Sequence, residues 1–214
     1  MATIINRYRP VVQPRLPAAP TEYSSEFIEQ YSNILRLYFN QLDNLTGVLL
    51  GETGGRFIRF PYGAFSSDQD QTATVNTATL MTFNTTDFAN EVSISSSQIT
   101  VVNAGIYNLQ FSVQFQNTDT AFQDVYIWLR QNGVDIPGST GFISVPNRHA
   151  GTDGHSIIGW NYFLSMAAND YVEIYWSVPN AAVTIQHLAA SGTPTKPSTQ
   201  SVVATLSFVS ALST

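Results

Sequence analysis

The sequence predicts an all-β protein, a sandwich or barrel of antiparallel strands, preceded by an extended arm and one α-helix. Three observations predict this class. Short segments of alternating polarity recur along residues 61–214, with turn residues between them. Aromatic residues make up 12% of the chain, which favours β structure. A sustained helical spacing of apolar residues is found at residues 24–45.

Residues 1–23 are predicted to form an extended arm. Prolines spaced as they are here block helix and sheet and favour an extended chain. The prolines are Pro10, Pro14, Pro17 and Pro20. The N-terminal part of the chain is mildly basic, so we expect the arm to dock on an acidic protein surface. The side chains expected to anchor it are Arg7, Tyr8, Arg9 and Arg15. A disordered tail is the alternative.

Residues 24–45 are predicted to form a helix, with Ser24 or Ser25 as its N-cap and Asn44 and Gly47 as stop signals. Its apolar residues follow the spacing of a coiled-coil seam. They are Ile28, Tyr31, Leu35, Tyr38, Leu42 and Leu45. We expect this seam to associate with other copies of the chain or to dock on a partner. Packing of the helix on its own domain is the alternative.

Residues 46–60 are rich in glycine and are predicted to be a flexible linker, so that residues 61–214 form the β domain. Tight turns are expected at Asn132-Gly133 and at Ala168-Asn169-Asp170. The predicted strands are Tyr62–Ser66, Thr79–Phe83, Glu91–Ser95, Gln98–Val102, Ile106–Gln116, Asp124–Gln131, Gly141–Val145, Ser156–Met166, Tyr171–Ser177, Val183–Ala189 and Ser201–Ala211.

The predicted strands differ in how their faces are composed. Residues 106–116 alternate strictly between apolar and polar side chains, so one face is predicted to be core and the other wet or packed on polar groups. Residues 156–166 and 201–212 carry apolar groups on both faces. Strands of that kind are covered on both sides, and the outer cover is expected to be another chain. Trp128 and Trp176 fall in the middle of strands and are expected in the core.

The charge of the chain excludes several partners. Its net charge is −6, and residues 61–214 alone hold three cationic side chains against ten acidic ones, a net charge of −7. Such a body repels phosphate backbones and anionic membranes, so we expect no nucleic-acid binding and no membrane insertion. The absence of cysteine excludes disulfides, thiolate metal sites and a cysteine nucleophile. The first residues lack the apolar run of a signal peptide, and we expect synthesis in a cytoplasm.

The search for catalytic and metal-binding groups predicts a protein that is not an enzyme and needs no cofactor or metal. The sequence contains neither Gly-x-Ser-x-Gly nor His-Glu-x-x-His. His149, Asp153 and His155 cluster in a glycine-containing segment that we interpret as a solvated loop. Asp68 and Asp70 lack the spacing of a calcium loop.

Four segments carry a resemblance to a known superfamily, and together they cover residues 61–212. Gly105–Phe115 resembles the central strand of the tumour necrosis factor and complement globular-head superfamily, and residues 126–134 resemble the next strand and turn. Residues 159–174 resemble its paired strands around an Ala-Gly-Asp turn, with Asn169 in place of the usual glycine. Residues 201–209 resemble its closing strand.

This resemblance implies a ten-stranded antiparallel jelly-roll sandwich that forms a homotrimer. In that superfamily the sheet with the central and closing strands faces the threefold axis. The residues expected to face the axis here are Trp160, Tyr162, Phe163, Val203 and Val209.

Two further segments resemble virion proteins of tailed phages. Thr193–Thr199 is similar to the segment before the closing strand in such proteins, and residues 16–44 more loosely resemble N-terminal segments of marine and cyanobacterial phage structural proteins. The expected function is a capsid decoration or cement protein on the outer virion surface, whose arm binds the major capsid protein or another virion protein. The alternative is a receptor-binding knob of a tail or head fibre that recognises a host glycan or protein, through residues 142–155 and 184–198.

Overall fold

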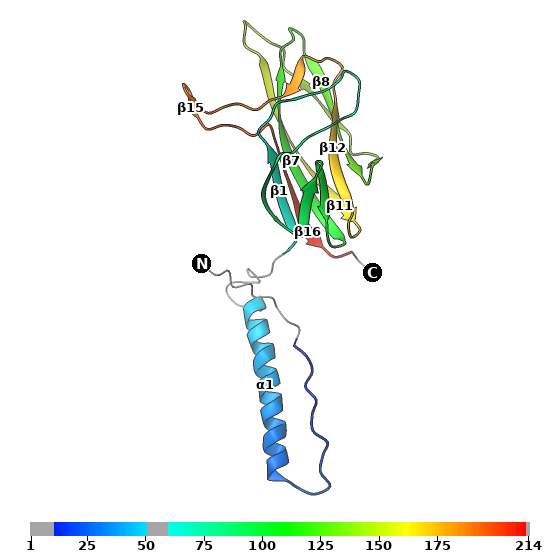
Figure 1. Ribbon diagram of the computed structural model, residues 1–214, viewed down its shortest axis with the longest axis vertical. Coiled ribbons are helices and arrows are strands. Elements are labelled where there is room, and N and C mark those ends of the chain that lie inside the picture. Colours follow the sequence, from blue (N-terminus) through cyan, green and yellow to red (C-terminus); the bar gives the residue numbers. More distant parts are fainter. Residues whose placement is uncertain (1–10, 51–59, 213–214) are drawn as a thin grey trace. The chain divides into compact units, whose positions relative to one another are not determined.

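The structure, a computed structural model, describes residues 11–50 and 60–212. The chain divides into two compact units, residues 1–59 and residues 60–214. The first contains the arm and the only helix among the described residues, and the second contains antiparallel sheets (Figure 1). The prediction of a mostly β protein with one helix and antiparallel sheets is confirmed.

Helix α1 spans Ser25–Leu50, five residues beyond the predicted end. Its N-cap is Ser24, whose hydroxyl accepts a hydrogen bond from the Phe27 amide at 3.2 Å. The predicted stop at Asn44 and Gly47 is wrong, because a glycine inside a helix costs only about 1 kcal/mol relative to alanine. The first five residues of the predicted linker, 46–50, therefore belong to the helix.

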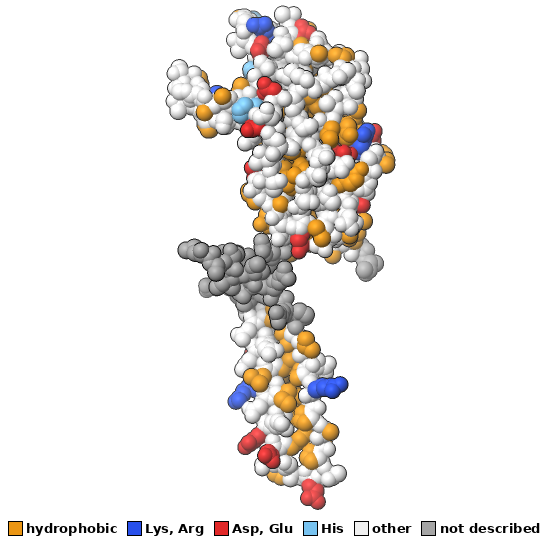
Figure 2. Space-filling view, viewed as in Figure 1, with side chains coloured by type: hydrophobic (Ala, Val, Ile, Leu, Met, Phe, Trp, Pro, Cys, Tyr) orange, Lys and Arg blue, Asp and Glu red, His pale blue; other side chains and the backbone are white. Residues whose placement is uncertain are grey.

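The described part of the arm runs beside this helix (Figure 1). Val11, Pro14 and Pro17 are half-buried, whereas the residues between them are exposed. A spacing of three matches the three residues per turn of a polyproline helix, so one side of the arm is covered. On the helix, an apolar stripe is visible in Figure 2. The seam residues Tyr31, Leu35, Tyr38, Leu42 and Leu45 are half-buried, and Ile28 is exposed.

The β unit contains two large sheets. Sheet A contains, in spatial order, β2 (Gln71–Thr72), β13 (Val183–Ile185), β7 (Gly105–Asn117), β16 (Val202–Ser210), β1 (Tyr62–Ser67) and β4 (Thr85–Asn90), and β11 (Gly154–Met166) also pairs with β7. Sheet B contains β10 (Gly141–Val145), β8 (Gln123–Gln131), β12 (Tyr171–Ser177), β6 (Gln98–Val101) and β5 (Val92–Ser95), with β3 (Thr79–Leu80) paired to β12 and β9 (Val134–Asp135) to β8. A small hairpin, β14 (Ser191–Gly192) and β15 (Thr195–Lys196), projects from the body (Figure 1).

The two sheets enclose one hydrophobic core. Strand β7 lies between β11 and β16 and sends Tyr107, Leu109 and Phe115 inward. On the other side β12 contributes Trp176, which is fully buried, and its ring lies 5.9 Å from that of Phe115. Strand β7 shows the alternation that the sequence predicts, and it sets which face of sheet A is core.

Both predicted turns are present. Asn132 and Gly133 have φ angles of 51° and 78°, the left-handed geometry of a two-residue hairpin turn between β8 and β9. Asn169 has a φ of 67° in the turn between β11 and β12, a conformation that asparagine tolerates better than most residues. Asp170 ties the two turns together, because it accepts hydrogen bonds from Asn132 Nδ2 at 2.7 Å and from the Ala167 amide at 2.8 Å.

Strand β4 was not predicted. All but one of its residues are exposed, and its sequence, Thr-Thr-Asp-Phe-Ala-Asn, shows no apolar alternation. It pairs only with β1, as the edge strand of sheet A. Its backbone pairing, and not burial of side chains, holds it in the sheet.

Trp160 closes one edge of the sandwich. It lies on β11 of sheet A, its ring stacks on Phe111 with centroids 6.2 Å apart, and its tip contacts Gly141 on β10 of sheet B. A Cβ atom at position 141 would overlap that ring.

Gly141→Ala should therefore lower the free energy of unfolding by about 1–3 kcal/mol. Gly159→Ala is the control, because its Cβ would meet only the Phe111 carbonyl oxygen, at 3.9 Å. Urea unfolding that gives both variants the same stability would contradict this packing.

Asp170 should make stability depend on pH. Burial raises the pKa of its carboxyl, but the hydrogen bonds from Asn132, the Ala167 amide and Gln131 outweigh this and hold the pKa below its usual value of 3.8. Stabilisation from a lowered carboxyl pKa is present above the usual pKa and is lost as pH falls through the folded one. Asp170→Asn should cost about 1 kcal/mol at pH 7 and less at pH 3. Melting curves at both pH values test this, and an unchanged difference would refute it.

Candidate oligomer interface

The outer face of sheet A carries the clearest candidate for a binding surface. Strands β16, β7 and β11 lie side by side and in register, so their outward side chains form rows. One row contains Val203, Ser112 and Gly159, and the next contains Thr205, Gln110 and Asn161. We call this surface, made by the outward residues of the three strands, the sheet A face.

The sheet A face carries no carboxylate, ammonium or guanidinium group. Strands β7, β11 and β16 contain no Asp, Glu, Lys or Arg. The face combines exposed apolar side chains with amides and hydroxyls. Ile157 is 70% exposed, Phe163 58% and Val209 51%. Depletion of charge together with exposed apolar groups is typical of the centre of a protein interface.

Amide side chains run along β7 through this face. Gln114 Nε2 donates to the Gln200 carbonyl oxygen at 2.6 Å, and Gln116 Nε2 donates to Asp153 Oδ2 at 2.6 Å. Asn108 Oδ1 is different, because it is closed off from solvent and has no hydrogen-bond partner among the described residues. Leaving a buried acceptor unpaired costs about 1–3 kcal/mol.

The middle of the sheet A face is hollowed. Gln110, Phe111, Ser112, Val203 and Thr205 line a shallow depression of about 240 Å³. Gly159 is the neighbour of Ser112 on the next strand. Neither a positive φ nor a close contact requires a glycine there. A glycine inside a strand without such a reason often marks the close approach of another backbone or side chain.

Only some of the residues that were predicted to face a trimer axis point outward from sheet A. Phe163, Val203 and Val209 point outward on the sheet A face. Trp160 and Tyr162 point inward and pack against the core, so their assignment to the outer face is corrected. The reason is the period of two along a strand, which puts neighbouring residues on opposite faces. Sequence reasoning did not single out Gly159 or Asn108; the signal available was a glycine in mid-strand.

The anchoring residues are only partly described. Arg15 is exposed on the arm, and Arg7, Tyr8 and Arg9 lie outside the described residues. Val12 is 79% exposed and Leu16 45%, so both polar and apolar side chains of the arm face solvent. An extended segment with exposed groups of both kinds can bind along another protein surface.

The aspartates singled out from the sequence accept hydrogen bonds within the chain. The amides of Gln69 and, next, Asn84 donate to Asp68 and lower its pKa. Asp153 accepts from Gln116 and forms an ion pair with Arg148 at 3.2 Å. Across residues 11–50 and 60–212, no group of three His, Cys, Asp or Glu side chains is placed to hold a metal ion. In the same ranges no helix is long and apolar enough to cross a membrane.

No family model matches the chain, and no curated protein matches its sequence.

Proposed function

We propose that this chain is a structural protein of a virus particle, a homotrimer of jelly rolls of the tumour necrosis factor type that decorates and stabilises the capsid. The observation that carries the proposal is the sheet A face, which has no charged side chain in its interior. The proposal of a trimer rests on residues 61–212, which resemble a trimeric superfamily. The proposal of a virion protein rests on residues 193–199 and 16–44, which resemble virion proteins of tailed phages.

Charge favours a second copy of the chain as the partner of the sheet A face. Residues 61–214 carry a net charge of −7, so two copies repel each other unless the touching surfaces lack charge. On the β unit the charged side chains lie outside β7, β11 and β16. Charge is therefore absent from the surface where identical acidic units can meet at least cost.

The size of the sheet A face also fits a specific interface. Three strands spaced about 4.8 Å apart and up to 13 residues long cover roughly 600 Å². A stable interface buries about 800 Å² per partner, so this face can form most of one. The hollow near Gly159 can receive an apolar side chain of a neighbouring copy.

In this proposal the chain binds to the capsid through its arm. Its prolines keep it extended at little entropic cost when it binds. Its arginines suit an acidic capsid surface, and Val12 and Leu16 add apolar contacts. Added buried surface between neighbouring capsid subunits then holds the shell against internal pressure.

Added bulk on the sheet A face next to the hollow should prevent assembly without unfolding the monomer. Gly159→Trp adds bulk on the outer side, where a Cβ has room within the chain. We expect light scattering after gel filtration to show loss of the oligomer, with the far-ultraviolet circular dichroism unchanged. Gly159→Ala is the matched control and should remain an oligomer. A tryptophan variant with the oligomeric mass of the unaltered chain would show that this face is not the interface.

Removing the arm should abolish attachment and leave assembly intact. A chain without residues 1–23 is expected to form a soluble oligomer that no longer sediments with capsid shells that lack the protein. A chain without residues 1–6 keeps Arg7, Tyr8, Arg9 and Arg15 and should still sediment with the shells. Capsid binding by the longer truncation would contradict attachment through the arm.

A further inference from the structure

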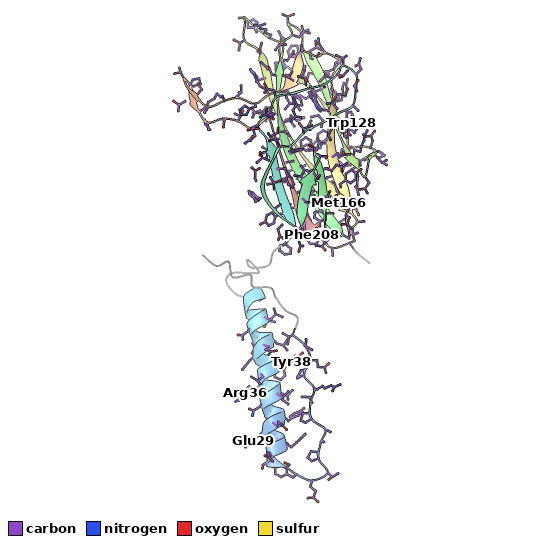
Figure 3. The ribbon with its side chains drawn as sticks, in the orientation of Figure 1. Glu29, Arg36, Tyr38, Trp128, Met166 and Phe208 are labelled. Carbon is purple, nitrogen blue, oxygen red and sulfur yellow. The ribbon has the colours of Figure 1, made fainter. Side chains whose placement is uncertain are left out.

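The outer face of sheet B carries four aromatic side chains from three neighbouring strands. On β8, Val125, Ile127 and Leu129 point into the core, which turns Tyr126 and Trp128 outward. Trp128 is labelled in Figure 3. Phe142 on β10 lies opposite Tyr126, and Tyr175 on β12 lies opposite Trp128. We call these four residues, Tyr126, Trp128, Phe142 and Tyr175, the aromatic platform. The expectation that Trp128 lies in the core is wrong, whereas that for Trp176 is confirmed.

The rings of the platform are held in place by one another and by polar groups. The ring centroids of Phe142 and Tyr126 are 6.0 Å apart, and those of Trp128 and Tyr175 are 5.9 Å apart. The Arg130 guanidinium carbon lies 4.0 Å from the centre of the Tyr175 ring. Such contacts between neighbouring strands stabilise ring positions.

Asp135 fixes the orientation of this end of the platform. Its Oδ1 accepts hydrogen bonds from Trp128 Nε1 and from Arg130 Nε, each at 2.8 Å. Hydrogen bonds from Arg130 and, next, Trp128 hold the pKa of Asp135 below its usual value, so it stays ionised at neutral pH. A ligand therefore meets rings that need little ordering when it binds.

The polar rim of the platform favours an uncharged ligand rich in hydroxyls. Asp124 and Asp135 lie beside the platform, where Asp124 accepts a hydrogen bond from the Ser144 hydroxyl and Asp135 accepts one from Trp128. Among the described residues, the cation at this end is Arg130, which is already paired with Asp135. Anions are repelled by the carboxylates, whereas sugar hydroxyls can donate to them.

The shape of the platform favours a chain over a single small molecule. Three neighbouring strands place the rings along a strip about 10 Å wide. Phe142 is 69% exposed and Tyr126 42%, so apolar ring surface is open to a ligand. Sugar rings offer apolar C–H faces for such surfaces, with hydroxyls at their edges.

We propose that the aromatic platform is a binding site for a neutral glycan chain. This goes beyond a role in holding a capsid together, and it does not depend on it. The platform lies on sheet B, and the sheet A face lies on the opposite sheet. One copy can therefore use both surfaces at once.

The test uses the full chain on a printed array of neutral oligosaccharides of glucose, galactose, mannose and N-acetylglucosamine, with oligogalacturonates and sialylated glycans as acidic counterparts. Bound glycans are then titrated by calorimetry. The double variant Phe142→Ser/Tyr126→Ser removes the exposed half of the platform. Phe88→Ser/Tyr62→Ser is the matched control, because these residues form a similar exposed pair on sheet A, with centroids 6.1 Å apart.

The unaltered chain is expected to bind neutral glycans and not the acidic ones. The platform variant should bind about tenfold more weakly or worse, and the control variant should bind as the unaltered chain does. Failure to bind any neutral glycan on the array would overturn the proposal, as would a preference for acidic glycans or equal loss in both variants. A platform variant that changes the oligomeric state while no glycan binds would identify the surface as a protein interface instead.

Discussion

The two faces of strand β7 constrain most of this structure. Its inward residues are apolar and its outward residues are mainly amides and hydroxyls, so the strand cannot shift its register by one residue without burying glutamine. It pairs along its length with β11 and over most of its length with β16. This pairing fixes which side chains of β11 and β16 point inward. It therefore sets the position of the core and the composition of the sheet A face.

Strands β12 and β10 begin and end at the residues that the sequence predicts. Elements whose position depends on a neighbouring strand or turn differ from the prediction. The edge strand β4 has no apolar pattern of its own, and Gly47 is tolerated inside a helix that extends to Leu50. In such places pairing or propagation of the helix outweighs local preference.

For the candidate surfaces too, some features can be predicted from a single strand and others depend on neighbouring strands. Alternation in the sequence separates Phe163 from Trp160 and Tyr162, yet the resemblance led to all three being grouped toward one axis. Trp128 was placed in the core because a tryptophan in mid-strand usually lies there, but Ile127 and Leu129 on either side already occupy the inward positions. The hollow beside Gly159 and the unpaired oxygen of Asn108 depend on distances between strands, which a single sequence does not contain.

The two large sheets thus have outer faces of different character. The sheet A face, on β7, β11 and β16, has no Asp, Glu, Lys or Arg and is hollowed, and we propose that other copies of the chain bind there. The outer face of sheet B is aromatic with a carboxylate rim, and we assign it to a glycan. Self-association is the claim on which the structural role rests, and sedimentation equilibrium of the full chain tests it most directly. The account predicts a species of three times the 23.5 kDa chain mass at micromolar concentration, and a mass of 23.5 kDa under the same conditions would contradict it.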